Sequence, residues 1–173
     1  MSISKSIIDI TNSYIETNAF LFEELPIKLD DLIKKEGIDL ISYPFKDEIS
    51  GVLILDGEKK TIGVNKNSSN VRKRFTIAHE LGHYMLHAQK SNMFMDNIFF
   101  RKKSEGYTSK EEKIEKEANY FAANILMPEN LIKKEIAELD CDLHDDITVA
   151  SLANKFEVSS SAMTFRLINL GLI

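Results

Sequence analysis

Cysteine is nearly absent from the sequence, since Cys141 is the only one among 173 residues. One thiol cannot form an intramolecular disulfide, and it leaves too few thiolates for a structural zinc site built on cysteines. We therefore expect Cys141 to be either a small apolar residue or a partly exposed free thiol. The chain is long enough to bury a core of its own without cross-links.

Long apolar runs and an excess of positive charge are also missing. No stretch approaches the roughly 18 apolar residues that a membrane-spanning helix needs. The N-terminal Met1-Ser2-Ile3-Ser4-Lys5 does not lead into the continuous apolar region of a signal peptide. The net charge of -5 repels phosphate groups on average, which disfavours indiscriminate binding to nucleic acid or to anionic membranes. These absences favour a cytoplasmic protein with no membrane partner.

The first third of the chain changes its hydrophobic period from helical to strand-like. Apolar residues at helical spacing predict a helix over about 3–20 and a second helix with Pro26 in its first turn and Gly37 as its stop. Three short segments rich in Ile, Val and Leu then predict strands, of which the last two form a hairpin: 38–43, 50–55 and 60–65.

The rest of the chain is mainly helical. A helix is predicted from about Ser69, with Asn67 or Ser68 as its N-cap, and the aromatic-rich segment 91–108 is predicted to be an irregular loop that packs into the core or walls a cleft. Four further helices are predicted over about 109–127, 128–139, 147–155 and 159–170. Few strands followed by many helices predict an α+β fold with a small three-stranded, antiparallel-type sheet and a mainly helical C-terminal part.

Two histidines in the predicted helix after the strands have the spacing of metal ligands. His79 and His83 are four residues apart, so on a helix both project from the same face and can reach one Zn²⁺. Glu80 lies beside that face, where it can take a proton from an attacking water. Gly82 inside a helix costs about 1 kcal/mol relative to Ala, so we expect another segment to approach closely there.

A catalytic zinc site needs a third protein ligand, and the long helix that follows offers one. Glu115 shares a face with small residues that permit close helix packing, so it is the expected ligand; Glu117, expected on the solvated face, is the alternative. Asn119 is expected to hold a ligand histidine by a hydrogen bond. His87 lies about 6 Å further along the helix axis than His83, which disfavours ligation, and the distant His144 is a weaker candidate still.

A hydrolytic site of this kind also needs a hydrogen-bond donor for the oxyanion that forms when water attacks a carbonyl group. Tyr107, Tyr84 and His144 are the candidates for that donor, and the sequence does not rank them.

Two segments carry a resemblance to a known family. Residues 74–87, which contain His79-Glu80-Leu81-Gly82-His83, and residues 115–128, which begin Glu115-Lys116-Glu117-Ala118-Asn119, resemble the ImmA/IrrE family of metallopeptidases. The strand segment 50–65 and the terminal segment 152–172 resemble the family as well, so the resemblance covers roughly 26–173.

This resemblance implies a zincin-like helix on which His79 and His83 bind Zn²⁺, with Glu115 as the third ligand and Glu80 as the general base. It further implies an endopeptidase that cleaves a regulatory protein, typically a helix-turn-helix repressor of a phage or mobile element. The alternative is a non-proteolytic metal-containing protein that binds and sequesters a transcriptional regulator. The expected division is an N-terminal helix over 1–25, a metallopeptidase core over 26–140 and a helical subdomain over 141–173.

The last two predicted helices resemble a helix-turn-helix pair. Residues 147–173 contain two cations, Lys155 and Arg166, against Glu157. Proteins that read DNA generally place several cations against phosphates. We therefore expect these helices to pack against the catalytic part or to dock a protein substrate, and we expect no direct binding to nucleic acid.

Overall fold

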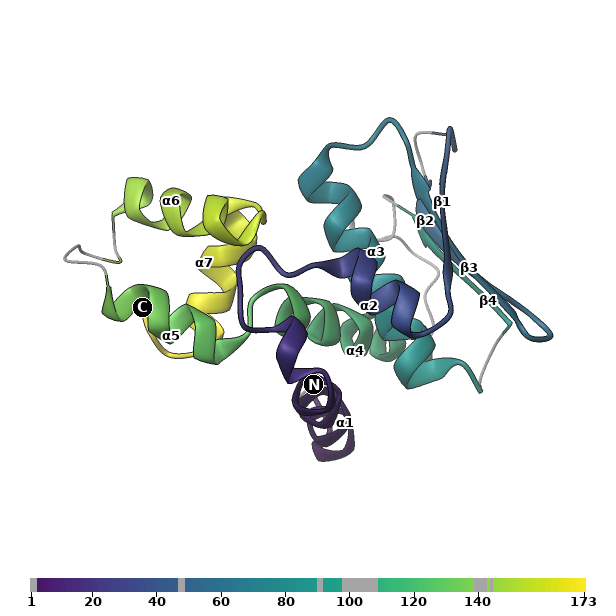
Figure 1. Ribbon diagram of the computed structural model, residues 1–173, viewed down its shortest axis with the longest axis horizontal. Helices are drawn as coiled ribbons and strands as arrows, with labels where there is room; N and C mark the ends of the chain where they lie inside the picture. Colours follow the sequence, from purple (N-terminus) through teal and green to yellow (C-terminus); the bar gives the residue numbers. More distant parts are fainter. Residues whose placement is uncertain (1–2, 47–48, 90–91, 98–108, 139–142, 144) are drawn as a thin grey trace.

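A computed structural model describes residues 3–46, 49–89, 92–97, 109–138, 143 and 145–173 (Figure 1). Its helices and strands follow one another in this order: α1 Lys5–Thr17, a short 3-10 turn Ala19–Leu21, α2 Leu29–Lys35, β1 Asp39–Tyr43, β2 Ile49–Asp56, β3 Lys59–Asn65, α3 Asn70–His87, β4 Met93–Asn97, α4 Ser109–Leu126, α5 Glu129–Ala137, α6 Asp146–Phe156 and α7 Ser160–Asn169. The predicted α+β class is confirmed.

The sheet differs from the prediction in the number and direction of its strands. It has four strands in the order β1-β3-β2-β4, and β1 runs parallel to β3 while the other pairs are antiparallel. The hairpin of β2 and β3 is as predicted. All five side chains of β1 are exposed, so the pattern of its residues does not indicate which strand it pairs with. β4 falls in the segment predicted to be irregular, and it becomes a strand by pairing with the edge of β2.

One predicted N-cap and one predicted helix start were wrong. Ser69, rather than Asn67 or Ser68, caps α3: its side chain accepts a hydrogen bond from the backbone N–H of Arg72. Helix α2 begins at Leu29, so Pro26 precedes the helix instead of lying in its first turn. The stop at Gly37 is confirmed, because this residue adopts a positive φ of 65° directly after the helix ends.

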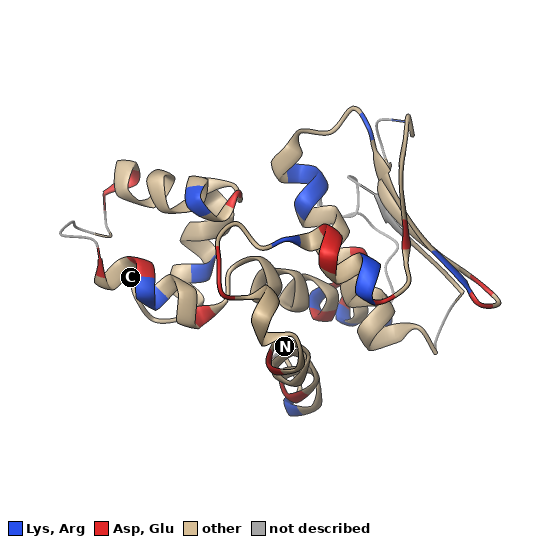
Figure 2. Ribbon diagram, in the orientation of Figure 1, with Lys and Arg blue, Asp and Glu red and all other residues tan. Residues whose placement is uncertain are grey.

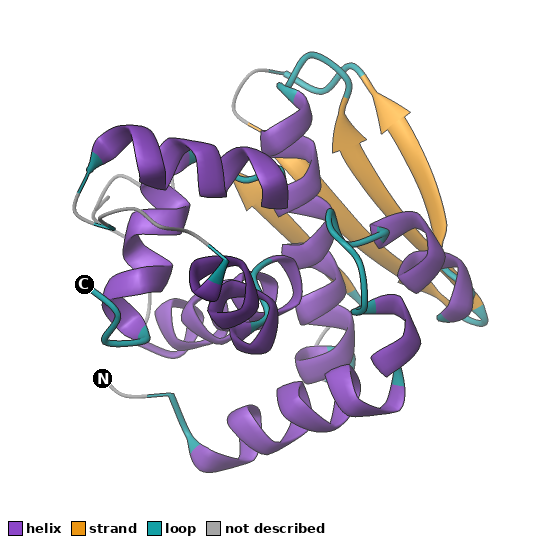
Figure 3. Ribbon diagram, turned by 60° about the vertical axis from the view of Figure 1, so that its left-hand side comes forward, coloured by secondary structure: helices purple, strands orange, loops and turns teal. Residues whose placement is uncertain are grey.

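Helix α3 is the central element of the fold. The helices gather on one face of the sheet, and α3 lies between that sheet and α4 (Figures 1 and 3). Its apolar side chains Ile77, Ala78 and Leu81 are buried in the core. Gly82 makes the predicted close approach possible, since a Cβ there would lie 3.1 Å from the carbonyl oxygen of Ala118 on α4.

The C-terminal helices α6 and α7 pack near the end of α4 (Figure 1). Arg166 on α7 is buried and donates hydrogen bonds to Asn124 Oδ1 at 2.9 Å and to the carbonyl oxygen of Met127 at 3.0 Å. Lys155 on α6 pairs with Glu135 on α5. Within the described part of the chain, no helix combines the length and the apolar character needed to cross a membrane.

Candidate metal centre

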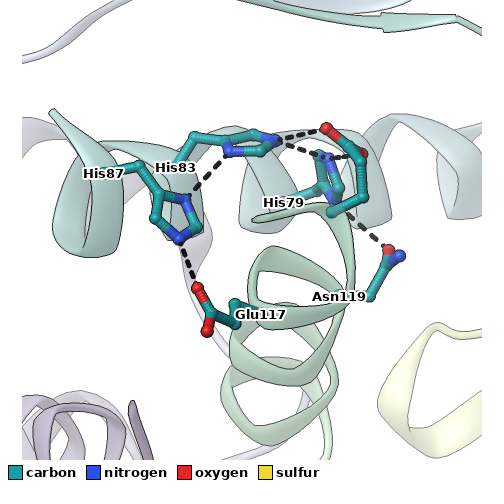
Figure 4. A network of polar contacts seen from close by, with 6 residues as sticks. His79, His83, His87, Glu117 and Asn119 are labelled. Carbon is teal, nitrogen blue, oxygen red and sulfur yellow. Dashed lines mark hydrogen bonds and ion pairs between the residues drawn. The ribbon is translucent and has the colours of Figure 1, made fainter. Parts of the chain in front are cut away.

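The two histidines of the sequence pattern lie on the buried side of α3. His79 and His83 are 1% and 2% exposed, and their Nε2 atoms are 3.0 Å apart (Figure 4). Their side chains meet because residues four apart on an α-helix lie one above the other. The same helix buries both rings because its apolar residues face the sheet and α4. Two nitrogen atoms are therefore presented toward one point.

Glu115 reaches that point from α4. Its Oε2 lies 3.2 Å from His79 Nε2 and its Oε1 lies 3.3 Å from His83 Nε2. Among the described residues, these three side chains form a group whose possible ligand atoms all lie within 4.8 Å of one another. The Glu115 side chain is 29% exposed, whereas the two histidines are buried, so the group borders solvent on the Glu115 side.

The spacing of these atoms suits a tetrahedral metal ion. Ligand distances of about 2.0–2.1 Å place the ligand atoms of tetrahedral zinc about 3.3 Å apart. The three separations here are 3.0, 3.2 and 3.3 Å. Three protein ligands leave the fourth corner of the tetrahedron for water or substrate, which is the arrangement of a catalytic rather than a structural zinc site. The donor set therefore fits Zn²⁺, and it also suits other divalent ions.

Neighbouring groups fix the orientation of both rings. Asn119 on α4 lies where the sequence predicted, with Oδ1 at 3.1 Å from His79 Nδ1 (Figure 4). A carbonyl oxygen only accepts, so His79 Nδ1 carries the proton and Nε2 presents its lone pair to the group. The ring of Phe94 on β4 stacks on His83 with centroids 4.6 Å apart and an interplanar angle of 15°. Phe94 thus forms one wall of the site.

His87 and Glu117 form a second polar pair behind His83. His87 Nδ1 lies 3.2 Å from His83 Nδ1, and His87 Nε2 lies 3.0 Å from Glu117 Oε2 (Figure 4). The prediction that Glu117 belongs to a solvated face was wrong, because it is only 4% exposed. Glu117 and Phe121 are four residues apart on the buried stripe of α4, and this periodicity is the signal that could have revealed the burial of Glu117.

Glu80 lies between α3 and the sheet and is fully buried. Its Oε1 is 3.6 Å from the position that a Cβ on Gly51 of β2 would occupy, so the carboxyl group lies next to β2. Of the proposed oxyanion donors, Tyr84 accepts a hydrogen bond from Lys60 Nζ at 2.8 Å. Tyr107 and His144 lie outside the described residues, as does Cys141.

Burial and mutual contact shift the protonation of the group. Burial lowers the pKa of His83 to about 4, although a hydrogen bond to Glu115 acts in the opposite direction. Burial by itself raises the pKa of Glu115, but the hydrogen bonds to His79 and His83 outweigh it and hold that pKa below its usual range. Near neutral pH, His83 is thus neutral and Glu115 ionised, which are the forms that bind a metal ion.

Comparison with known proteins gives three findings. The family model of the IrrE N-terminal-like domain, the M78 peptidases, matches residues 33–167. An uncharacterized immunity region protein 2 of Bacillus phage phi105 is 31% identical over 98 residues, which are 57% of this chain and 57% of that protein. A Mycobacterium tuberculosis transcriptional regulator has a similar fold, with a TM-score of 0.61 and 18% identity over 95% of this chain and 47% of its own. The chain spans about half the length of both proteins.

Proposed function

Since the chain belongs to the M78 peptidase family, whose model is the IrrE N-terminal-like domain, we propose that it is a metal-dependent endopeptidase that cleaves a regulatory protein. The convergence of His79, His83 and Glu115 carries this proposal. These three side chains hold the ion, and Zn²⁺ is the metal that their chemistry and spacing suit best. A bound Zn²⁺ supplies Lewis acidity toward a water molecule and a peptide carbonyl.

In this proposal, Glu80 moves the proton. Its carboxylate accepts a proton from the attacking water and later returns it to the amine of the departing peptide segment. The position of Glu80 directly after the ligand His79 on α3 supports this role. Burial also excludes bulk water from the carboxyl group, which strengthens its interactions with nearby charge.

We propose a helix-turn-helix repressor of a phage or mobile element as the substrate, cleaved in the cytoplasm. The similarity to a protein named for a phage immunity region supports a substrate of this kind. Direct binding to DNA receives little support from α6 and α7, because Arg166 is buried and Lys155 is paired. Helix α6 carries both acidic and basic residues (Figure 2), and Arg166 is the single charged residue of α7.

The variant Glu80→Gln tests the proposal. It keeps the shape of the side chain and all three ligands, so it is expected to bind zinc as tightly as wild type. Cleavage is expected to fall by about 10²–10⁴-fold, because the general base is lost. The measurements are zinc affinity, by competition with a chromophoric chelator, and cleavage of a helix-turn-helix repressor offered as substrate, by mass spectrometry with and without chelator.

The control is Glu112→Gln on α4, which removes an exposed carboxylate outside the site and is expected to change neither quantity. If Glu80→Gln relieves repression in full without cleavage, the protein acts by sequestering its partner. Failure of the wild-type protein to bind zinc contradicts the metal centre itself.

A further inference from the structure

Three buried side chains form a continuous polar row behind the candidate metal centre. The row runs from His83 to His87 on α3 and then to Glu117 on α4 (Figure 4). Their exposed fractions are 2%, 1% and 4%. Lys113 Nζ lies 3.8 Å from the other carboxyl oxygen of Glu117, at the outer end of the row.

The positions of the protons follow from the chemistry of each group. A carboxylate only accepts hydrogen bonds, so His87 Nε2, at 3.0 Å, is the donor to Glu117. A neutral imidazole that is protonated at Nε2 has a lone pair at Nδ1. With His87 as a neutral ring, its Nδ1 accepts and His83 Nδ1, at 3.2 Å, carries the proton that it donates, which is the assignment that leaves His83 Nε2 able to bind a metal ion. His83 Nε2 is left with its lone pair, which faces His79 Nε2 and Glu115.

We propose that His87 and Glu117 are positioning residues that hold His83 in its Nδ1-protonated tautomer. Through the hydrogen bonds of the row, the negative charge of Glu117 polarises the ring of His83. This inference rests on the proposed function, because it requires that His83 bind a metal ion. The hydrogen bonds fix the ring of His83, and a carboxylate at the end of the row raises the basicity of Nε2.

The two ligand histidines are then supported differently. His79 donates to the neutral amide of Asn119, whereas His83 donates through His87 to a charged group. We therefore expect His83 to be the stronger electron-pair donor of the two. The alternative reading is a buried polar pair that only stabilises the packing of α3 on α4.

Four variants separate these readings. His87→Phe keeps an aromatic ring and removes both nitrogen atoms. His87→Gln keeps an acceptor for His83 and a donor for Glu117. Glu117→Gln keeps the shape of the side chain and removes the charge, and it tests the row even if His87→Phe does not fold. Glu112→Gln, on the exposed face of the same helix, is the matched control.

The first measurement is the zinc dissociation constant by chelator competition, with the urea denaturation of each zinc-free variant as a check on folding. His87→Phe and Glu117→Gln are expected to weaken zinc binding by about 10–100-fold, the usual effect of removing a group that supports a ligand histidine. His87→Gln is expected to restore most of the affinity, and Glu112→Gln to leave it unchanged.

The second measurement is the ¹⁵N NMR spectrum of the histidine side chains in the zinc-loaded protein. It is expected to show protons at His83 Nδ1 and His87 Nε2 and none at His87 Nδ1. Zinc affinity within twofold of wild type in both His87→Phe and Glu117→Gln, an equal loss in His87→Gln and His87→Phe, or a doubly protonated His87 would each overturn the inference. A wild-type protein that binds no zinc overturns the proposed function as well.

Discussion

At the scale of single residues, three histidines of one helix have three different surroundings. His79 contacts the amide of Asn119, His83 contacts His87, and His87 contacts the carboxyl group of Glu117. Because a hydrogen bond to one ring nitrogen determines what the other nitrogen presents, these partners decide the chemical role of each ring. The three residues have the same type and the same four-residue spacing, so only their partners distinguish them.

The burial of His83 predicts a pH dependence of the zinc-free protein. Its pKa is about 4 in the folded chain and 6.5 without this environment, so the unfolded chain binds the proton more readily between these values. As far as His83 determines it, the free energy of unfolding is therefore highest above about pH 6.5 and falls as the pH decreases toward 4. We expect a loss of about 1–2 kcal/mol between pH 7 and pH 5.

Urea denaturation in the presence of chelator measures this loss. The variant His83→Gln has no titrating group at this position, so its free energy of unfolding should depend less on pH over the same interval. An equally steep dependence in this variant would assign the loss to other groups.

At the scale of elements, the contacts of α3 depend on residues without side chains. Gly82 permits the approach of α4, and Gly51 permits the approach of β2 to the same helix. A Cβ on Gly51 would lie 2.3 Å from Thr76 Cγ2, which is closer than atoms can pack. The site therefore depends on two close contacts, one on each side of the helix that carries its histidines.

The variant Gly51→Ala is expected to destabilise the protein by about 1–3 kcal/mol, because the added methyl group displaces Thr76 or separates β2 from α3. Thr76→Ser removes the methyl group that causes the clash, so the double variant should recover part of the lost stability. A double-mutant cycle from urea denaturation gives this coupling. Additive effects of the two substitutions would show that the contact is not the cause.

At the scale of the whole molecule, Arg166 joins the C-terminal helices to the end of α4. Its guanidinium is buried, and burial lowers its pKa from the ordinary value. The groups that receive its hydrogen bonds are Asn124 Oδ1 and the carbonyl oxygen of Met127. The helix-turn-helix resemblance of α6 and α7 thus coexists with an arginine that is directed into the protein.

Arg166→Met is expected to reduce the free energy of unfolding by about 1–3 kcal/mol, because it leaves buried acceptors without this donor. Lys155→Gln removes an exposed cation from the same pair of helices, and its stability should match wild type within error. Urea denaturation compares the two variants. Unchanged stability in Arg166→Met, together with a loss of nucleic-acid binding in a gel shift, would contradict the assignment of Arg166 to packing.

Much of the fold was predictable because its signals are local. Apolar periodicity gave most of the helices, and the turn at Asp56-Gly57 gave the hairpin of β2 and β3. The place of β1 and the existence of β4 were not predictable in the same way. Both depend on which sheet edge is available once the other elements have packed, and β1 has no buried face to specify its partner.

The sequence alone determined the pairing of His79 with His83, because the geometry of one helix fixes the separation of residues four apart. It also indicated Glu115 and Asn119 from the small residues that share their face of α4. Only the tertiary structure decided that Glu117 is buried and contacts His87, since that depends on the rotation of α4 against α3. Contacts within a helix follow from its backbone hydrogen bonds, whereas contacts between helices follow from how whole surfaces pack.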